Sequence, residues 1–199
     1  FWQLNEANQV VGGKVMLYDI REGKRVKKPF NHINWMHKLL KLENYNLSQC
    51  LFGLHLIKEF HGDTVAITES EKTALIMSIF LPNYLWLATG SKTNFKSQLL
   101  EPIKKYKIIA FPDKSEFNDW NNTCKDLNQN GYSITCSKII ESKNYPEGFD
   151  LADVFIENLK INKAGQTFNY NSRHNDEIKR LVKINPCLID LIEMFDLIY

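Results

Sequence analysis

Two stretches of this chain share one layout, in which a buried strand pattern ends at a carboxylate and a helical pattern follows. In the first, residues 65–67 are apolar, Glu69 comes after them, and helical periodicity follows. In the second, residues 107–111 form the strand pattern, Asp113 follows it, and a helical pattern covers 117–130. Strands that alternate with helices are joined by right-handed crossovers, which favour a parallel sheet.

A third strand pattern, residues 84–88, lies between these two and runs into a turn containing Gly90. Since parallel strands end at a common edge of their sheet, Glu69, Gly90 and Asp113 are predicted to lie together there. The predicted fold is α/β, a parallel sheet of about four strands flanked by helices. The strands are expected at 64–68, 84–88, 107–111 and 133–136, and the helices at 72–80, 94–105, 117–130 and 151–159.

A simpler interpretation of these carboxylates stays open. Ser70 has the character of a helix cap, and Glu69 and Glu71 would complement the positive end of the helix that follows. Asp150 and Asp153 lie three residues apart near another helix start, where carboxylates are expected for capping alone.

The order of these motifs resembles that of a known domain family. The chain has a strand followed by Glu, a small residue and a helix, then a strand with Thr-Gly, and then a strand with Pro-Asp and a helix. This order is similar to that of the Toprim domain of bacterial and phage primases, topoisomerases and some nucleases. Residues 49–55 resemble the segment before the Toprim glutamate in primases, and residues 149–155 the segment that closes the domain in primase-helicases. The resemblance covers residues 1–160 and is closest to an uncharacterised Toprim-like family encoded by mobile elements of gut bacteria.

The resemblance implies an acidic site that binds Mg²⁺. It assigns Glu69 and Asp113 as catalytic residues and metal ligands, and Asp150 and Asp153 as further metal ligands. Because Mg²⁺ is held by few carboxylates together with waters and substrate phosphates, such a site tolerates the loss of one ligand.

Three positions depart from the family pattern. Ser70 stands where the family has Gly, Thr73 where it has an aspartate, and Ser115 where it has the second aspartate of a pair. Two missing carboxylates, with Lys72 and Lys114 nearby, argue against tight binding of two metal ions.

Three functions follow from this resemblance and its departures. The first is a primase-like nucleotidyltransferase that depends on magnesium. The second is a catalytically degenerate Toprim module that binds nucleic acid. The third is a Toprim nuclease. The primase-type flanking segments favour primase ancestry, and the expected role is in mobile-element DNA metabolism.

The basic residues are unevenly distributed. Residues 14–41 contain eight basic and two acidic residues, a net charge of +6, so the rest of the 199-residue chain carries −4. Aromatic residues alternate with these charges, a combination suited to single-stranded DNA or RNA. The residues assigned to this partner are Lys24, Arg25, Lys27 and Lys28, and also Lys92, which lies in the turn after residues 84–88. An ordinary exposed hairpin with its turn at 21–24 and its aromatics in a core is the alternative.

The chain is expected to comprise three parts. Residues 1–60 form a β-rich subdomain, with strands at 1–4, 13–20 and 24–28 and helices at 35–40 and 47–60. Residues 61–160 form the Toprim-like domain. Residues 161–199 form a helical extension, with helices at 177–183 and 187–197.

Composition excludes several classes of protein. No apolar run approaches the ~20 residues of a membrane span, and there is no signal-peptide pattern, so we expect a cytoplasmic protein without a membrane partner. Four widely spaced cysteines without a Cys-x-x-Cys pair indicate reduced thiols.

Since the chain opens without methionine, we expect a longer protein, with a zinc-binding or helicase module outside residues 1–199. Gly90 to Thr93 lack the earlier glycine of an ATP-binding phosphate loop.

Overall fold

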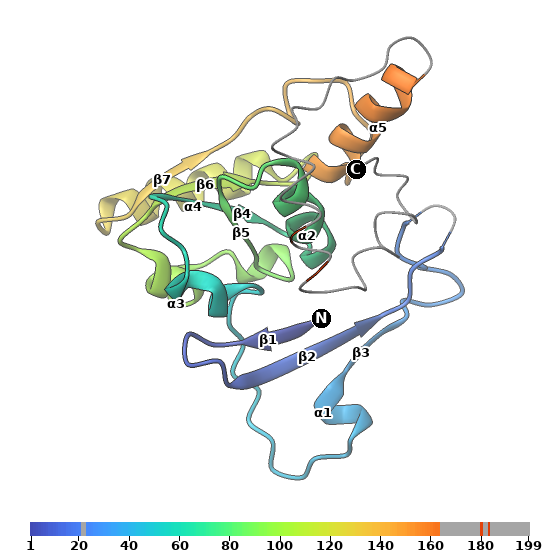
Figure 1. Ribbon diagram of the computed structural model, residues 1–199, viewed down its shortest axis with the longest axis vertical. Coiled ribbons are helices and arrows are strands. Elements are labelled where there is room, and N and C mark those ends of the chain that lie inside the picture. Colours follow the sequence, from blue (N-terminus) through green and yellow to red (C-terminus); the bar gives the residue numbers. More distant parts are fainter. Residues whose placement is uncertain (21–22, 164–179, 181–182, 184–199) are drawn as a thin grey trace. The chain divides into compact units, whose positions relative to one another are not determined.

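The computed structural model describes residues 1–20, 23–163, 180 and 183, and the chain divides into two compact units. The first unit comprises residues 1–14 and 35–155, and the second comprises residues 15–34 and 156–199. Figure 1 labels the helices and strands.

Four strands form a parallel sheet in the first unit, in the order β5-β4-β6-β7. They are β4 (Thr64–Thr68), β5 (Leu85–Ala88), β6 (Lys107–Phe111) and β7 (Ser133–Cys136). Thr68 lies opposite Ala88 on one side and Phe111 on the other, so β4, β5 and β6 end level with one another. The predicted parallel sheet is confirmed, and three carboxyl strand ends share one edge.

Three helices follow strands of this sheet, as the alternating pattern predicts. They are α2 (Glu71–Phe80) after β4, α4 (Phe117–Gln129) after β6 and α5 (Leu151–Lys163) after β7. Trp120, Cys124 and Leu127 are the buried residues of α4, and their spacing places them on one face of the helix. α4 packs against β7, and α2 packs against β4 and β5.

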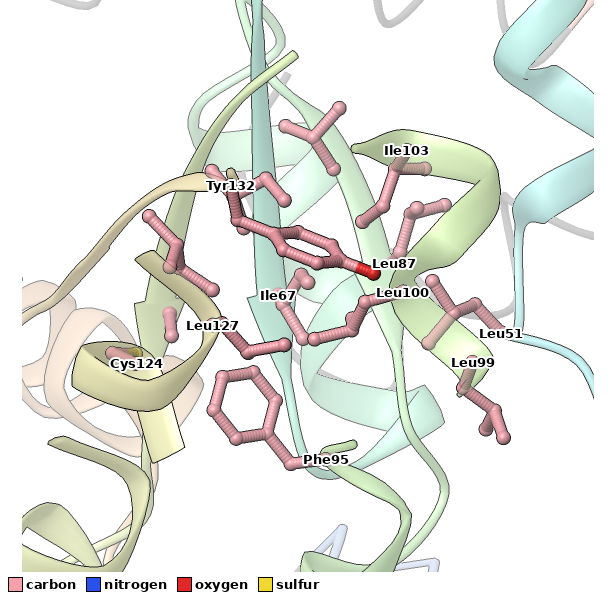
Figure 2. Close-up of a cluster of buried hydrophobic side chains, with 14 of the residues drawn as sticks. Leu51, Ile67, Leu87, Phe95, Leu99, Leu100, Ile103, Cys124, Leu127 and Tyr132 are labelled. Atoms are coloured by element: carbon pink, nitrogen blue, oxygen red, sulfur yellow. The ribbon is translucent and has the colours of Figure 1, made fainter. Parts of the chain in front are cut away.

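The core of the first unit is built from the sheet, α4 and the segment between β5 and β6 (Figure 2). Ile67 in β4, Leu87 in β5 and Leu100 in α3 are fully buried. The ring of Phe95 stacks on that of Trp120, with centroids 4.1 Å apart. This packing fixes the strand ends and therefore the turns that follow them.

The predicted helix at 94–105 is wrong, because three short pieces replace it. These are η2 (Lys92–Asn94), α3 (Ser97–Leu100) and η3 (Glu101–Ile103). Lys96 has extended backbone angles and separates the first two pieces. Pro102 lacks the N–H that a continuous α-helix would need at this point.

The N-terminal strands form a three-stranded sheet in the order β1-β2-β3. They are β1 (Trp2–Leu4), β2 (Val10–Met16) and β3 (Ile33–Trp35), and the short helix α1 (Met36–Leu39) follows. β1 and β2 are antiparallel. The expected β-rich character of this region is confirmed, and the predicted helix at 35–40 corresponds to α1.

The predicted strand at 24–28 is wrong. Two backbone hydrogen bonds pair this region with residues 17–19, from Asp19 N–H to the carbonyl of Lys24 and from Val26 N–H to that of Leu17. They produce only an isolated bridge between Tyr18 and Arg25. A ladder of two bonds is too short to count as a strand.

The predicted helix at 47–60 is also wrong, since only the 3₁₀ turn η1 (Leu54–Lys58) forms there. Phe52 instead exchanges two backbone hydrogen bonds with Ala88, at N–O distances of 2.9 and 3.2 Å. Gly53 then takes a φ of +85°, which ends the extended conformation before the turn begins. The pairing adds a short antiparallel contact to the edge strand β5.

The helices predicted at 177–183 and 187–197 lie outside the described residues, apart from residues 180 and 183. Within the part of the chain that the structure describes, no helix has the length and apolar character that crossing a membrane would require.

Candidate functional site

The turns after β4 and β5 are joined at the carboxyl edge of the sheet. The backbone N–H of Gly90 donates to the carbonyl of Glu69 at 2.8 Å, and the N–H of Thr89 donates to that of Thr68 at 3.0 Å. Gly90 has a φ of +75°, a conformation that glycine adopts without strain. Glu69 and Gly90 are therefore direct neighbours, as the end of a parallel sheet requires.

Asp113 follows β6 at the same edge and is half-buried. Burial raises the pKa of its carboxyl to about 8, and the negative charges of Asp150, Glu69 and Asp153 act in the same direction. The ammonium of Lys72 opposes them and lowers this pKa. Asp113 thus belongs to a cluster of carboxylates that includes every acidic residue assigned to the site from sequence.

Asp150 and Asp153 bond to each other at the start of α5. The Asp153 N–H donates to Oδ1 of Asp150 at 2.9 Å, and the Asp150 N–H donates to Oδ2 of Asp153 at 3.3 Å. Oδ2 of Asp150 also accepts the hydroxyl of Thr73 at 2.7 Å, in a buried contact between α2 and α5. Thr73, which stands where the resemblance expects an aspartate, therefore contributes a donor to this pair.

Glu71 is paired with a lysine from β2. The Lys14 Nζ donates to Glu71 Oε1 and to the Gly90 carbonyl, each at 2.7 Å. Glu71 is 2% exposed and Lys14 is 8% exposed. The ammonium also lies 5.8 Å from the centre of the Trp35 ring. These contacts form a buried ion pair that fixes the turn at Gly90.

Sequence reasoning missed Lys14, which it counted only among the basic residues of segment 14–41. The one available signal is a lysine within a strand whose neighbours are glycines and apolar residues. Its partner Glu71 lies 57 residues further along the chain, so nothing local identifies the pair.

The predicted site residue Lys92, and two residues that depart from the family pattern, have partners of their own. The exposed Lys92 forms an ion pair with Glu116 at 3.0 Å. The Lys114 Nζ donates to the carbonyls of Glu141 and Lys143, which turns its charge toward that loop. Ser115, at the position of the missing second aspartate, donates its N–H to Glu141.

The basic residues predicted to bind nucleic acid lie in the second unit. All four side chains are exposed: Lys24, Arg25, Lys27 and Lys28. Phe30, which is 62% exposed, lies against His32 with ring centroids 4.3 Å apart. Exposed cations beside an exposed ring are a surface on which phosphates and bases can bind.

The donors at the sheet edge match Mg²⁺ in type. Glu69 and Asp113 supply carboxylate oxygens, and Mg²⁺ commonly uses one or two carboxylates with waters and phosphates completing its shell. Across the described residues, no group of three or more His, Cys, Asp or Glu side chains is arranged to hold a metal ion. The chemistry of the donors therefore fits a site with two carboxylates, in which waters and phosphates would complete the metal's shell.

Comparisons with known proteins place the chain in a family without an assigned function. A model for the family described as "Domain of unknown function (DUF6371)" matches residues 1–114, which is more than half of the chain. No curated protein matches the chain.

The crystal structure of the Aquifex aeolicus primase, covering its zinc-binding and RNA polymerase domains, is similar at 15% identity and a TM-score of 0.48. The match covers 98% of this chain and 44% of that chain, so this chain spans less than half the length of the primase structure. A likeness at this level carries no function over.

Proposed function

We propose that this chain, which belongs to the DUF6371 family, is a primase-related, Toprim-like module of mobile-element DNA metabolism. It binds single-stranded DNA or RNA and uses one Mg²⁺ ion at Glu69 and Asp113 for nucleotidyl transfer. A zinc-binding or helicase module outside residues 1–199 completes the working protein.

The observation that supports this proposal most is the environment of Asp113. Its carboxyl is half-buried among the charges of Asp150, Glu69 and Asp153, and its pKa is raised to about 8. Like charges placed together at a strand end repel one another and do not stabilise a fold, whereas a cation site requires them. A bound divalent cation would offset this repulsion and favour the ionised form of Asp113.

The residues of this chain divide the work as follows. Glu69, at the end of β4, would accept the proton of an attacking hydroxyl or contact the metal, and Asp113 would hold the metal from the neighbouring strand end. The exposed Lys24 and Lys28 contact phosphates of the nucleic-acid strand. When bound, Mg²⁺ would neutralise charge on the α-phosphoryl group, which gains a bond to the attacking hydroxyl oxygen and loses its bond to the departing pyrophosphate.

Mn²⁺ binding and primer synthesis test this proposal on the full-length protein. Electron paramagnetic resonance measures Mn²⁺ affinity, and extension on a single-stranded template measures synthesis. We expect Glu69→Gln and Asp113→Asn to weaken Mn²⁺ binding at least tenfold and to abolish synthesis, without unfolding the protein. The exposed Glu59→Gln and Asp126→Asn are matched controls that should leave both unchanged.

Two results would overturn the assignment of the chemistry. Primer synthesis that survives Glu69→Gln would place the chemistry elsewhere, and metal-dependent strand cleavage without synthesis would select a nuclease.

A second candidate is a degenerate module that binds nucleic acid without catalysis. Two contacts favour it: Thr73 donates to Asp150 where the family has an aspartate, and Ser115 points its N–H to Glu141 where the family has a second one. Binding of single-stranded DNA by the full-length protein, with neither Mn²⁺ binding nor synthesis, would select this candidate.

A further inference from the structure

Lys72 is a cation built into the acidic cluster. It belongs to the first turn of α2, and its side chain is 15% exposed. Its Nζ lies 3.7 Å from Oδ2 of Asp150 and 3.9 Å from Oδ1 of Asp153. Its positive charge also acts on Asp113. The ammonium therefore faces two carboxyl groups and acts electrostatically on a third.

All four carboxylate oxygens of Asp150 and Asp153 already have a partner. Oδ1 of Asp150 accepts the N–H of Asp153, and Oδ2 accepts the hydroxyl of Thr73. Oδ2 of Asp153 accepts the N–H of Asp150, and Oδ1 pairs with Lys72. A metal ion at this pair would have to compete with these donors and would lie beside a fixed positive charge.

We propose that Lys72 takes the place of a divalent cation at Asp150 and Asp153, and so restricts metal binding to the side of Glu69 and Asp113. This deepens the proposed one-metal site and rests on it for the role of Glu69. It also replaces the assignment of Asp150 and Asp153 as metal ligands. In this arrangement α2 supplies both the ammonium and the Thr73 hydroxyl.

The physical reason is the electrostatic repulsion between the Lys72 ammonium and a divalent cation. A divalent cation between the two aspartates would lie within a few ångströms of the Lys72 ammonium, and repulsion at that range is strong in a partly buried site. Removal of the ammonium leaves the carboxylates without a counter-charge, and a divalent cation then becomes the most favourable replacement.

Mn²⁺ titration of the full-length protein, followed by electron paramagnetic resonance, tests this. We expect Lys72→Met, which keeps the length of the side chain and removes its charge, to bind one additional Mn²⁺ or to bind Mn²⁺ at least tenfold more tightly. Lys72→Arg keeps the charge and should behave as the wild type. Asp150→Asn added to Lys72→Met should abolish the gain, which would locate the new site.

The Mn²⁺ titration can distinguish a failure of this inference from a failure of the proposed function. A gain in Lys72→Met that persists when Glu69→Gln is added supports the role of Lys72 even if Glu69 binds no metal. Unchanged or weaker Mn²⁺ binding in a folded Lys72→Met protein overturns the inference. If that variant fails to fold by circular dichroism, Lys72→Gln gives the same comparison with a polar side chain, and equal Mn²⁺ binding there overturns the inference as well.

Discussion

The ammonium of Lys14 donates to the carboxylate of Glu71 at 2.7 Å, in a contact that is almost fully buried. The same ammonium donates to the carbonyl of Gly90 at 2.7 Å. A residue of the N-terminal sheet thus holds both the start of α2 and the turn after β5. Lys14 thereby links β2 to the carboxyl edge of the parallel sheet.

Loss of Lys14 should strongly destabilise the protein. Lys14→Met leaves a buried carboxylate without its partner, and breaking such a pair lowers the free energy of unfolding by about 3–5 kcal/mol. Urea denaturation measures the change. Replacing both residues, Lys14→Met with Glu71→Met, should recover most of the loss because no charge then stays buried.

The matched control is a lysine in a solvated ion pair. Lys107 pairs with Asp63 at 3.2 Å, and the two side chains are 69% and 73% exposed. Lys107→Met should leave the unfolding free energy nearly unchanged, because solvent screens an exposed pair. A Lys14→Met protein as stable as this control would show that the buried pair has little energetic role.

Gly90→Ala should test how tightly the turn is packed. Gly90 and Gly148 have nearly the same φ, +75° and +72°. A Cβ at Gly90 would lie 2.9 Å from Oε1 of Glu71, whereas one at Gly148 would have no atom within 4 Å. We expect Gly148→Ala to lower the unfolding free energy by about 1 kcal/mol, and Gly90→Ala by about 2–4 kcal/mol. Equal losses in urea denaturation would contradict the packing argument.

The parallel sheet could be predicted because its signals are local. Residues 65–67 are apolar and fully buried, and their strand has the predicted bounds of 64–68. The strands at 107–111 and 133–136 also have their predicted bounds, with alternate residues such as Ile108 and Ile134 buried. A strand that is buried on both faces consists of apolar residues, so a short apolar run that ends at polar residues is enough to predict where the strand lies in the sequence.

The errors occur where a distant partner decides the structure. The apolar spacing in 47–60 matches a helix, but the backbone of Phe52 pairs with Ala88, and no local pattern indicates that bond. Lys14 has the sequence character of a surface charge, and only Glu71 makes its burial possible. Glu69 and Asp113 could be predicted because they follow strands, whereas the contacts of Lys72 with Asp150 and Asp153 depend on the fold.

Asp113→Asn should stabilise the protein in a way that depends on pH. The pKa of Asp113 is raised from 3.8 to about 8 in the folded protein, so the folded state holds this proton more tightly than the unfolded state. Its contribution to stability is therefore present below pH 4 and is lost as the pH rises to 8. Asparagine does not titrate, so the variant gains relative to the wild type across this window.

We expect that gain to be on the order of 5 kcal/mol at pH 8 and to shrink toward zero at pH 4. Urea denaturation of both proteins without divalent cations, at several pH values, measures it. The exposed Asp126→Asn serves as the control and should give no such trend. A stability difference between Asp113→Asn and the wild type that stays constant with pH would contradict the raised pKa.

The last prediction concerns the exposed basic side chains of the second unit. These side chains are Lys24, Arg25, Lys27 and Lys28. Replacing all four with alanine should weaken binding to single-stranded DNA and reduce the dependence of that binding on salt. Each phosphate contact to a single strand contributes a slope of about −0.7 in log affinity against log salt, so losing four contacts should reduce the slope by about 3. Fluorescence anisotropy with a labelled oligo-dT, at salt concentrations from about 50 to about 200 mM, measures this slope.

The control removes the same charge from the first unit. It replaces four exposed lysines that belong to other elements and loops: Lys58, Lys96, Lys105 and Lys125. If binding depends only on net charge, the two quadruple variants will lose the same affinity and slope. If the second unit forms the contact, its variant loses most of the slope while the control keeps it, because counterion release depends on the phosphates that are actually neutralised. An unchanged slope in the Lys24, Arg25, Lys27 and Lys28 variant would remove this segment from the binding surface and leave Lys92 as the remaining predicted contact.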